Sequence, residues 1–368
     1  MFCEYVTGAG RMLTAPLVGF PGLELTGTSL AENLRESSKQ IETLIALNNA
    51  VDFDIIFPMM DLTVETEALG GKMSWDRDEM PTIDGISVET RADADSLVIP
   101  GIGKGNRLNV SIETCAAFRR AFPGKILWAY VLGPFSIAGR LMGMTEVAIA
   151  IKLEPETVHA ALKKADKLLK QQINALIDAG ADGVMILEPA SGMLREDDAN
   201  EFSNAYIKEL AGVIKQRGKT PSLHNCGNID HLIESLCATG IEALHIGSVC
   251  DPFEIYPRIP DDVVLMGNLD PTEVFLRADA EKVQRETTAL LERMTGCSRY
   301  IISSGCDIPP GTSIENLKSF ERAVTESRPD AGGFRLQNSP YISPSAFMPI
   351  FSAAGFFGSP GMVMMLPA

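Results

Sequence analysis

The sequence predicts an α/β protein, a (β/α)8 TIM barrel with an insertion after the second strand and an irregular C-terminal tail. Eight short apolar runs alternate with longer segments of helical character, and most runs lack the polar alternation of a sheet with one solvated face. Buried strands with helices between them are typical of a parallel sheet, and eight of them can close into a barrel. The alternation alone is also compatible with an open, doubly wound sheet; the count of eight favours the barrel.

The apolar runs are the predicted strands, in chain order. They occupy residues 15–20, 53–59, 126–132, 183–187, 221–223, 243–246, 263–266 and 300–302. The longer segments between them are the predicted helices, at residues 30–49, 155–179, 196–217, 229–238, 271–294 and 314–325. Pro155 and Pro271 suit the first turn of a helix, and Gly180 and Gly240 suit helix ends.

Two regions depart from this alternation and set the expected domain bounds. Residues 67–109, rich in Gly and Asp, are expected to form an insertion near the barrel mouth, with a hairpin around 83–90. Residues 336–368 carry no charge, but prolines interrupt every apolar run, so this segment cannot cross a membrane as a helix. We expect one barrel domain over 1–327 and an irregular apolar tail over 328–368.

Charge and cysteine content exclude several classes of protein. The formal net charge is −16, which argues against a nucleic-acid partner because phosphate contacts need a basic surface. Seven cysteines without a CxxC pair indicate a reducing compartment rather than a disulfide framework. The N-terminus lacks the features of a signal peptide, and no run of about 20 apolar residues occurs. We expect a cytoplasmic protein with no membrane partner.

The clearest chemical signal lies where the fifth predicted strand ends. His224 and Cys226 are two residues apart there, so on a continuing strand both side chains face the same side. Cys306 ends the eighth predicted strand at the same edge, where barrels place their chemistry. A single buried cysteine is usually a small hydrophobic residue. One imidazole and two thiols together form a soft ligand set suited to Zn²⁺, with the open fourth position of a catalytic site.

Other polar residues follow the predicted strands at the same edge. Asp61 and Glu188 are candidate catalytic residues, and Asn268 and Asp270 are candidates for cofactor binding. Such residues can position a substrate or orient the imidazole of a metal ligand. A helix cap or a loop hydrogen bond is the structural alternative for each of them. Asp270 in particular precedes Pro271 and can cap the next helix.

Several separate stretches between residues 53 and 324 resemble the uroporphyrinogen decarboxylase superfamily, in particular its corrinoid-dependent methyltransferase branch. They are MDLTVETEALG at 60–70, VLGPFS at 131–136, EPAS at 188–191, HNCGN at 224–228, GNLDP at 267–271 and SGC at 304–306. The resemblance implies a (β/α)8 barrel in which His224, Cys226 and Cys306 bind zinc. It also implies methyl transfer between a methyl-corrinoid (methylcobalamin) and a thiol such as coenzyme M. No Asp-x-His-x-x-Gly stretch occurs, so we expect the corrinoid on a separate corrinoid protein.

The sequence departs from this branch at one point and leaves two alternatives open. Gly247 stands where the coenzyme M enzymes have an acidic residue, so water, substrate, Glu188 or Asp251 is expected as the fourth ligand, and the acceptor can differ. A metal-free enzyme like uroporphyrinogen decarboxylase is the first alternative, since Asp61 aligns with a catalytic aspartate of those enzymes. Against it, Arg11 is a poor match to their arginine-rich motif. A non-catalytic metal- or corrinoid-binding module is the second alternative.

Overall fold

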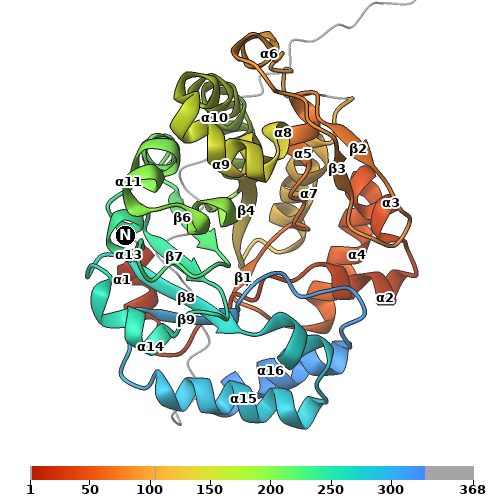
Figure 1. The fold of residues 1–368 in the computed structure, drawn as a ribbon. Coiled ribbons are helices and arrows are strands. Elements are labelled where there is room, and N and C mark those ends of the chain that lie inside the picture. Colours follow the sequence, from red (N-terminus) through yellow and green to blue (C-terminus); the bar gives the residue numbers. More distant parts are fainter. Residues whose placement is uncertain (1, 104, 328–368) are drawn as a thin grey trace, which may run out of the picture. The chain divides into compact units, whose positions relative to one another are not determined.

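The structure, a computed structural model, describes residues 2–103 and 105–327, and its centre is a curled parallel sheet (Figure 1). Seven strands pair in the order β1-β4-β5-β6-β7-β8-β9, and every pair is parallel. Their bounds are β1 (Ile55–Ile56), β4 (Ile126–Leu132), β5 (Gly183–Leu187), β6 (Thr220–Asn225), β7 (Ala243–Ile246), β8 (Val264–Leu269) and β9 (Tyr300–Ser304). The predicted (β/α)8 architecture is confirmed.

An eighth segment closes the barrel between β9 and β1. Thr14 forms a parallel bridge with Ile302, and the Ala15 amide donates to the Ile302 carbonyl at 3.1 Å. On the other side, the Ile55 amide donates to the Thr14 carbonyl at 3.1 Å. The expected first strand at 15–20 is therefore wrong in its bounds, because the regular pairing is confined to a one-residue bridge at Thr14.

The strands are buried because helices cover the outside of the sheet and side chains fill the inside. Every residue of β5, β6, β7, β8 and β9 is buried, which explains the continuous apolar runs in the sequence. Trp128 and Tyr300 are among the largest fully buried side chains. The polar residues His224, His245 and Ser303 are exceptions within this interior, and they belong to the site described below.

The helices surround the sheet (Figure 1). Their bounds are α1 (Phe2–Gly8), α2 (Leu23–Thr26), α3 (Leu30–Arg35), α4 (Ser37–Ala50), α5 (Val64–Ala68), α6 (Arg91–Ser96), α7 (Leu108–Ala121), α8 (Pro134–Met142), α9 (Met144–Leu153), α10 (Pro155–Asp178), α11 (Glu196–Ala199), α12 (Ala205–Gln216), α13 (Ile233–Cys237), α14 (Pro252–Ile255), α15 (Ala280–Arg293) and α16 (Ile314–Glu326). The shorter helical segments are η1 (Phe20–Gly22), η2 (Pro189–Met193), η3 (Asn200–Asn204), η4 (Tyr256–Arg258) and η5 (Pro271–Leu276).

The predicted helices are present, but three of them are divided. Glu36 adopts an extended conformation (φ −124°, ψ 111°) and separates α3 from α4 within the predicted helix 30–49. A π-helical turn, η3, lies between α11 and α12, and the π-helical η5 precedes α15. Pro155 begins α10 as expected, and Gly180, which follows its end, has φ +109°.

The insertion after the second strand contains a small antiparallel hairpin. Its strands are β2 (Lys72–Ser74) and β3 (Thr82–Asp84), so the hairpin begins before the expected position at 83–90. The predicted tail at 328–368 lies outside the described residues.

Within the described part of the chain, no single helix is long and apolar enough to cross a membrane. The consecutive helices α8 and α9 meet the length and hydropathy requirement only when they are taken together. The chain bends by 105° between them.

Candidate metal centre

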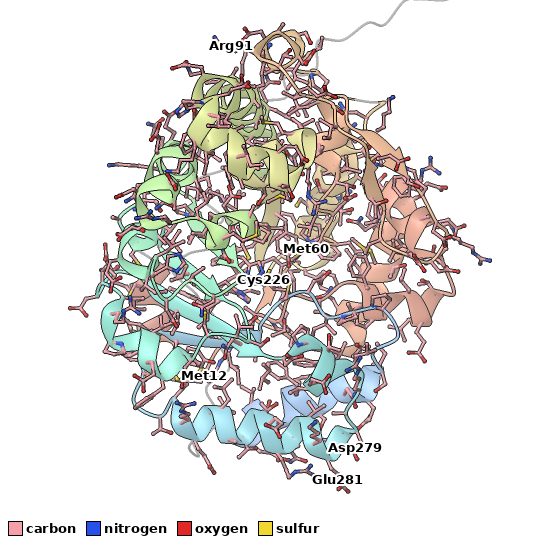
Figure 2. All side chains as sticks on the ribbon, in the orientation of Figure 1. Met12, Met60, Arg91, Cys226, Asp279 and Glu281 are labelled. Atoms are coloured by element: carbon pink, nitrogen blue, oxygen red, sulfur yellow. The ribbon has the colours of Figure 1, made fainter. Side chains whose placement is uncertain are left out.

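Three predicted ligands converge at the carboxyl ends of two strands. His224 is the fifth residue of β6, Cys226 follows β6 directly, and Cys306 follows β9 (Figure 2 labels Cys226). The ligand atoms of the three side chains lie within 4.8 Å of one another, although 80 residues of chain separate the two cysteines. Parallel strands produce this convergence because all of their carboxyl ends meet at the same end of the barrel.

The donor atoms suit a soft divalent metal ion. Nε2 of His224 is buried and has no hydrogen-bond partner among the described residues. Buried polar atoms normally have a partner, so this nitrogen is available to bind a ligand. The hydrogen bond from Cys306 and then the nearby imidazole lower the pKa of the Cys226 thiol. The same bond raises the pKa of Cys306, so the pair carries one negative charge more readily than two. A zinc ion fits this set of one imidazole and two thiols.

A second histidine supports the first from the neighbouring strand. His245 is the register partner of His224 in the β6–β7 pair, and their Nδ1 atoms lie 2.8 Å apart. Nε2 of His245 lies 2.8 Å from Oγ of Ser303, whose hydroxyl donates to the Ala15 carbonyl at 2.6 Å. Burial, and then the nearness of His224, hold the pKa of His245 well below its usual value, so its ring is neutral.

The side chain of Asn225 holds the loop that carries Cys226. Its amide nitrogen donates to the Glu188 carbonyl at 2.6 Å and to Oγ of Ser191 at 3.2 Å. Its amide oxygen accepts from the Gly227 amide at 2.8 Å. Because Asn225 lies between the two ligands and is fully buried, these bonds position the residues on both sides of it.

Gly247 leaves no room for a side chain at the expected position of the acidic ligand. A Cβ atom there would collide with the Cys226 carbonyl oxygen and lie 2.7 Å from the Cys226 Cα atom. Asp251 is turned away, since it caps α14 through the Phe253 amide and pairs with Arg293. Neither residue therefore belongs to the converging group.

Glu188 is fully buried and anchors the start of α8. Its carboxylate accepts from the amides of Phe135 at 3.0 Å and Ser136 at 2.7 Å, and from the Ser136 hydroxyl. Burial raises the pKa of Glu188 to about 7 against the lowering effect of these bonds. It is not part of the group that could hold a metal ion.

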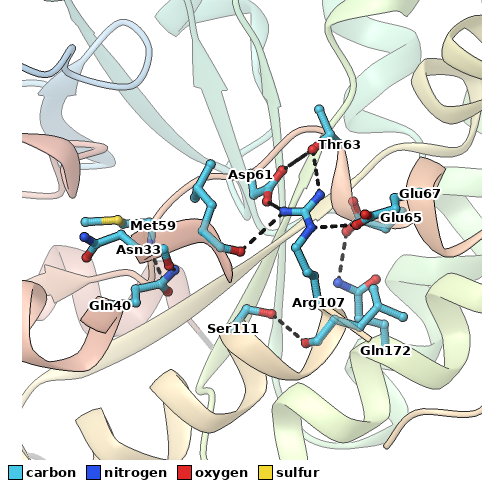
Figure 3. A network of polar contacts seen from close by, with 12 residues as sticks. Asn33, Gln40, Met59, Asp61, Thr63, Glu65, Glu67, Arg107, Ser111 and Gln172 are labelled. Atoms are coloured by element: carbon cyan, nitrogen blue, oxygen red, sulfur yellow. Dashed lines mark hydrogen bonds and ion pairs between the residues drawn. The ribbon is translucent and has the colours of Figure 1, made fainter. Parts of the chain in front are cut away.

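Asp61 lies in a network of its own, shown in Figure 3. It forms an ion pair with Arg107, and Thr63 donates its amide and hydroxyl to the same carboxylate. Arg107 also contacts Glu67 at 2.6 Å and lies over the Trp75 ring, 4.6 Å from its centre. The carboxylate of Asp61 is therefore already paired.

Asn268 and Asp270, predicted to bind a cofactor, hold loops in this structure. Asn268 donates to the carbonyls of Gly247 at 2.9 Å and Cys250 at 2.6 Å. Asp270 caps η5 by accepting from the amides of Thr272 and Glu273, which is the structural alternative considered for it.

Sequence reasoning missed Tyr130 and Asp307, which lie beside Cys306. The Tyr130 hydroxyl is buried without a hydrogen-bond partner in the described residues, and its ring stacks on Phe57 at 4.9 Å. Burial, followed by the nearby charges of Asp307 and Cys306, raises the pKa of Tyr130 well above its usual range. Adjacency to Cys306 was the only available signal for Asp307; Tyr130 gave none.

Arg11 lies at the other end of the barrel. Its guanidinium pairs with Asp54, which directly precedes β1, and donates to the Met12 carbonyl at 3.2 Å. The amino ends of the strands meet there, so Arg11 is remote from the converging ligands.

Comparisons with known proteins agree with this architecture. The profile of the uroporphyrinogen decarboxylase (URO-D) family matches residues 21–327. Curated proteins named uroporphyrinogen decarboxylase are similar to the chain. The protein from Anaeromyxobacter dehalogenans is 28% identical over 307 residues, which cover 80% of this chain and 87% of that protein. The protein from Pseudomonas fluorescens is 26% identical, covering 77% and 81%.

A solved methyltransferase from Methanosarcina mazei shares the fold, with a TM-score of 0.79 over 88% of this chain and 97% of the other at 19% identity. A B12-independent methionine synthase from Shewanella has a TM-score of 0.55 at 14% identity over 86% and 96%. The chain is thus a barrel enzyme with a polar site at the carboxyl ends of its strands. It belongs to the uroporphyrinogen decarboxylase family.

Proposed function

We propose that the protein is a zinc-dependent methyltransferase that moves a methyl group between a methyl-corrinoid, carried by a partner corrinoid protein, and a small thiol. The convergence of His224, Cys226 and Cys306, with the imidazole Nε2 unpartnered among the described residues, is the observation that supports this proposal. A metal-free decarboxylase has no use for this set of ligands.

Zinc, once bound, would keep the sulfur of an acceptor thiol deprotonated and nucleophilic. The protein's contribution is the charge of the ligand set. Cys226 and Cys306 as thiolates offset both charges of the ion and His224 adds none, so an acceptor thiolate stays electron-rich. In the transfer, the acceptor thiol would release its proton to solvent and its sulfur would form a bond to the methyl carbon. The carbon–cobalt bond would break with its electron pair remaining on cobalt, which would pass from cobalt(III) to cobalt(I).

Arg140 supports an acceptor that carries a negative charge, such as coenzyme M. It lies on α8, is half-buried, and makes no hydrogen bond or ion pair with the described residues. Its neighbours Asp61 and Glu65 are engaged with Arg107 and with Gln172. A guanidinium that is partly removed from water and has no anionic partner costs free energy, and a bound anion would offset that cost.

Uroporphyrinogen decarboxylation is the second candidate, and the names of the curated relatives favour it. Two contacts speak against it. Asp61, aligned with the catalytic aspartate, is paired with Arg107, and Arg11 is bound to Asp54 at the opposite end of the barrel. A tetrapyrrole with several carboxylates would need several free cations at the mouth, more than Arg140 supplies.

Elemental analysis of the purified protein tests the proposal. We expect about one zinc per chain in wild type and little in His224→Ala or Cys306→Ser, as for a three-ligand site. Cys297→Ser is the matched control, because Cys297 is also half-buried but lies outside the ligand group, and it should retain zinc. Wild type without zinc after metal supplementation would overturn the proposed mechanism.

Methyl transfer is then measured with free methylcobalamin and either 2-mercaptoethanesulfonate or neutral 2-mercaptoethanol. We expect cobalt(I) formation to be lost with zinc. Arg140→Gln should raise the KM for the anionic thiol selectively. Zinc-independent conversion of uroporphyrinogen would instead identify a decarboxylase, and bound zinc without either activity would indicate a binding module.

A further inference from the structure

When both imidazole rings are neutral, the hydrogen bonds behind His224 allow one assignment of protons. The Ala15 carbonyl can only accept, so the single hydroxyl proton of Ser303 points to it across 2.6 Å. Oγ of Ser303 must then accept from His245, whose Nε2 lies 2.8 Å away. Nε2 of His245 therefore carries a hydrogen atom.

The hydrogen on Nε2 of His245 also fixes the position of the hydrogen on His224. A neutral imidazole with its hydrogen on Nε2 has a lone pair on Nδ1. Nδ1 of His245 thus accepts from Nδ1 of His224 across 2.8 Å, and the hydrogen of His224 resides on that Nδ1. Its Nε2 is left with a lone pair, and this is the buried atom that has no other partner among the described residues.

We propose that Ser303 and His245 are positioning residues that hold His224 in the Nδ1–H tautomer, so that its Nε2 lone pair faces the two thiols before any metal arrives. A neutral histidine side chain in water favours the Nε2–H tautomer, so this arrangement must be imposed by the protein. Partners behind a ligand histidine commonly change metal affinity by about 10–100-fold. The inference rests on the proposed zinc site for its purpose, but the tautomer itself exists without zinc.

Nitrogen NMR of the metal-free protein tests the tautomer directly. The chain has four histidines, so a two-bond proton–nitrogen correlation of ¹⁵N-histidine-labelled protein is readily assigned with single variants. We expect a protonated Nδ1 and an unprotonated Nε2 for His224, and the reverse for His245. His224 with its hydrogen on Nε2 would overturn the proposal, whether or not the protein binds zinc.

Zinc affinity, measured by competition with a chromophoric chelator, tests the purpose. His245→Met removes the acceptor for His224 and should weaken zinc binding about 10–100-fold. His245→Gln restores a donor toward Ser303 and an acceptor toward His224, so it should stay within a few-fold of wild type. His159→Gln, a histidine on α10 remote from the ligands, is the control and should have no effect.

Ser303→Ala covers the case in which His245→Met does not fold. It removes one oxygen from a buried strand and should return a measurable share of His245 to the Nδ1–H tautomer, with weaker zinc binding. Unchanged tautomers and unchanged affinity in the Ser303→Ala variant would overturn the proposal. If wild type binds no zinc but has the expected tautomers, only the proposed function fails.

Discussion

Gly247 directly follows β7 and packs against the backbone of Cys226. A methyl group at this position would lie 2.7 Å from the Cys226 Cα atom, so the loop must move to admit it. We expect Gly247→Ala to destabilise the fold by about 1–3 kcal/mol and to lower the zinc content. Gly212→Ala, in α12 with open space around it, is the control and should be neutral or stabilising by up to about 1 kcal/mol. Unfolding in urea and elemental analysis of both variants check this; equal zinc in both contradicts it.

Glu65 gives a second prediction at the scale of one residue. It is fully buried, accepts from the Leu132 amide and from Gln172, and burial raises its pKa from 4.5 to about 7. The folded state therefore holds a proton that the unfolded state releases above about pH 4.5. This contribution to stability is complete below that pH and is lost as the pH rises through 7.

Glu65→Gln removes this titration. Between pH 5 and pH 8 the wild type should lose about 2–3 kcal/mol more of its free energy of unfolding than the variant does. Urea unfolding at several pH values measures the difference. Glu188, with a pKa raised in the same way, is common to both proteins and cancels. Parallel stability curves would contradict the assignment of a neutral, buried Glu65.

At the scale of single residues, the separation of two residues along the chain determined whether their contact could be predicted from the sequence. His224 and Cys226 are two residues apart, so one strand brings them together and their nearness was predictable from a short motif. His245 meets His224 through strand register, and Arg140 is left without a partner among the described residues by the packing of α8. No local sequence pattern encodes either arrangement.

Between elements, Arg107 links the beginning of α7 to the loop before α5. Its side chain and that of Asp61 are only 10% and 12% exposed. Arg107→Met should destabilise the protein by about 3–5 kcal/mol, because it leaves a buried carboxylate unpaired. Adding Asp61→Asn should recover much of this loss. A double-mutant cycle in urea measures both effects.

The exposed pair of Arg91 and Asp95 on α6 is the control for that cycle. Its side chains are 54% and 58% exposed, and Arg91→Met should cost less than about 1 kcal/mol. A loss of similar size for Arg107→Met would show that the network in Figure 3 contributes little to stability.

Two kinds of secondary-structure element were predictable from the sequence: helices with one buried face, and short strands that are buried along their whole length. The amphipathic α10 and α16 and the apolar strands followed from periodicity. α8 was missed because nearly all of its residues are buried, so its sequence shows no polar face. The one-residue bridge at Thr14 is held by neighbouring strands rather than by its own sequence.

At the scale of the whole molecule, the stability of the segment that closes the barrel between β9 and β1 should depend on Ser304. Oγ of Ser304 accepts from the Leu17 amide at 2.9 Å in the barrel interior. Ser304→Ala should cost about 1–3 kcal/mol by leaving that amide unpaired. Hydrogen exchange should accelerate at Leu17 but not in β5, which β1 and β4 separate from the closing segment. Uniform acceleration, or none, would contradict a local role.

The contacts of this closing segment also determine when, during synthesis, the barrel can be completed. Ala15 leaves the ribosome about 290 residues before Ser303 and Cys306, and domains complete their folding only when such distant contacts form. A nascent chain with His224 and Cys226 already exposed has neither the second thiol nor the serine that orients His245. A chain that stops short of Cys306 therefore presents an incomplete ligand set. We therefore expect the proposed metal centre to form only after Cys306 has been synthesised.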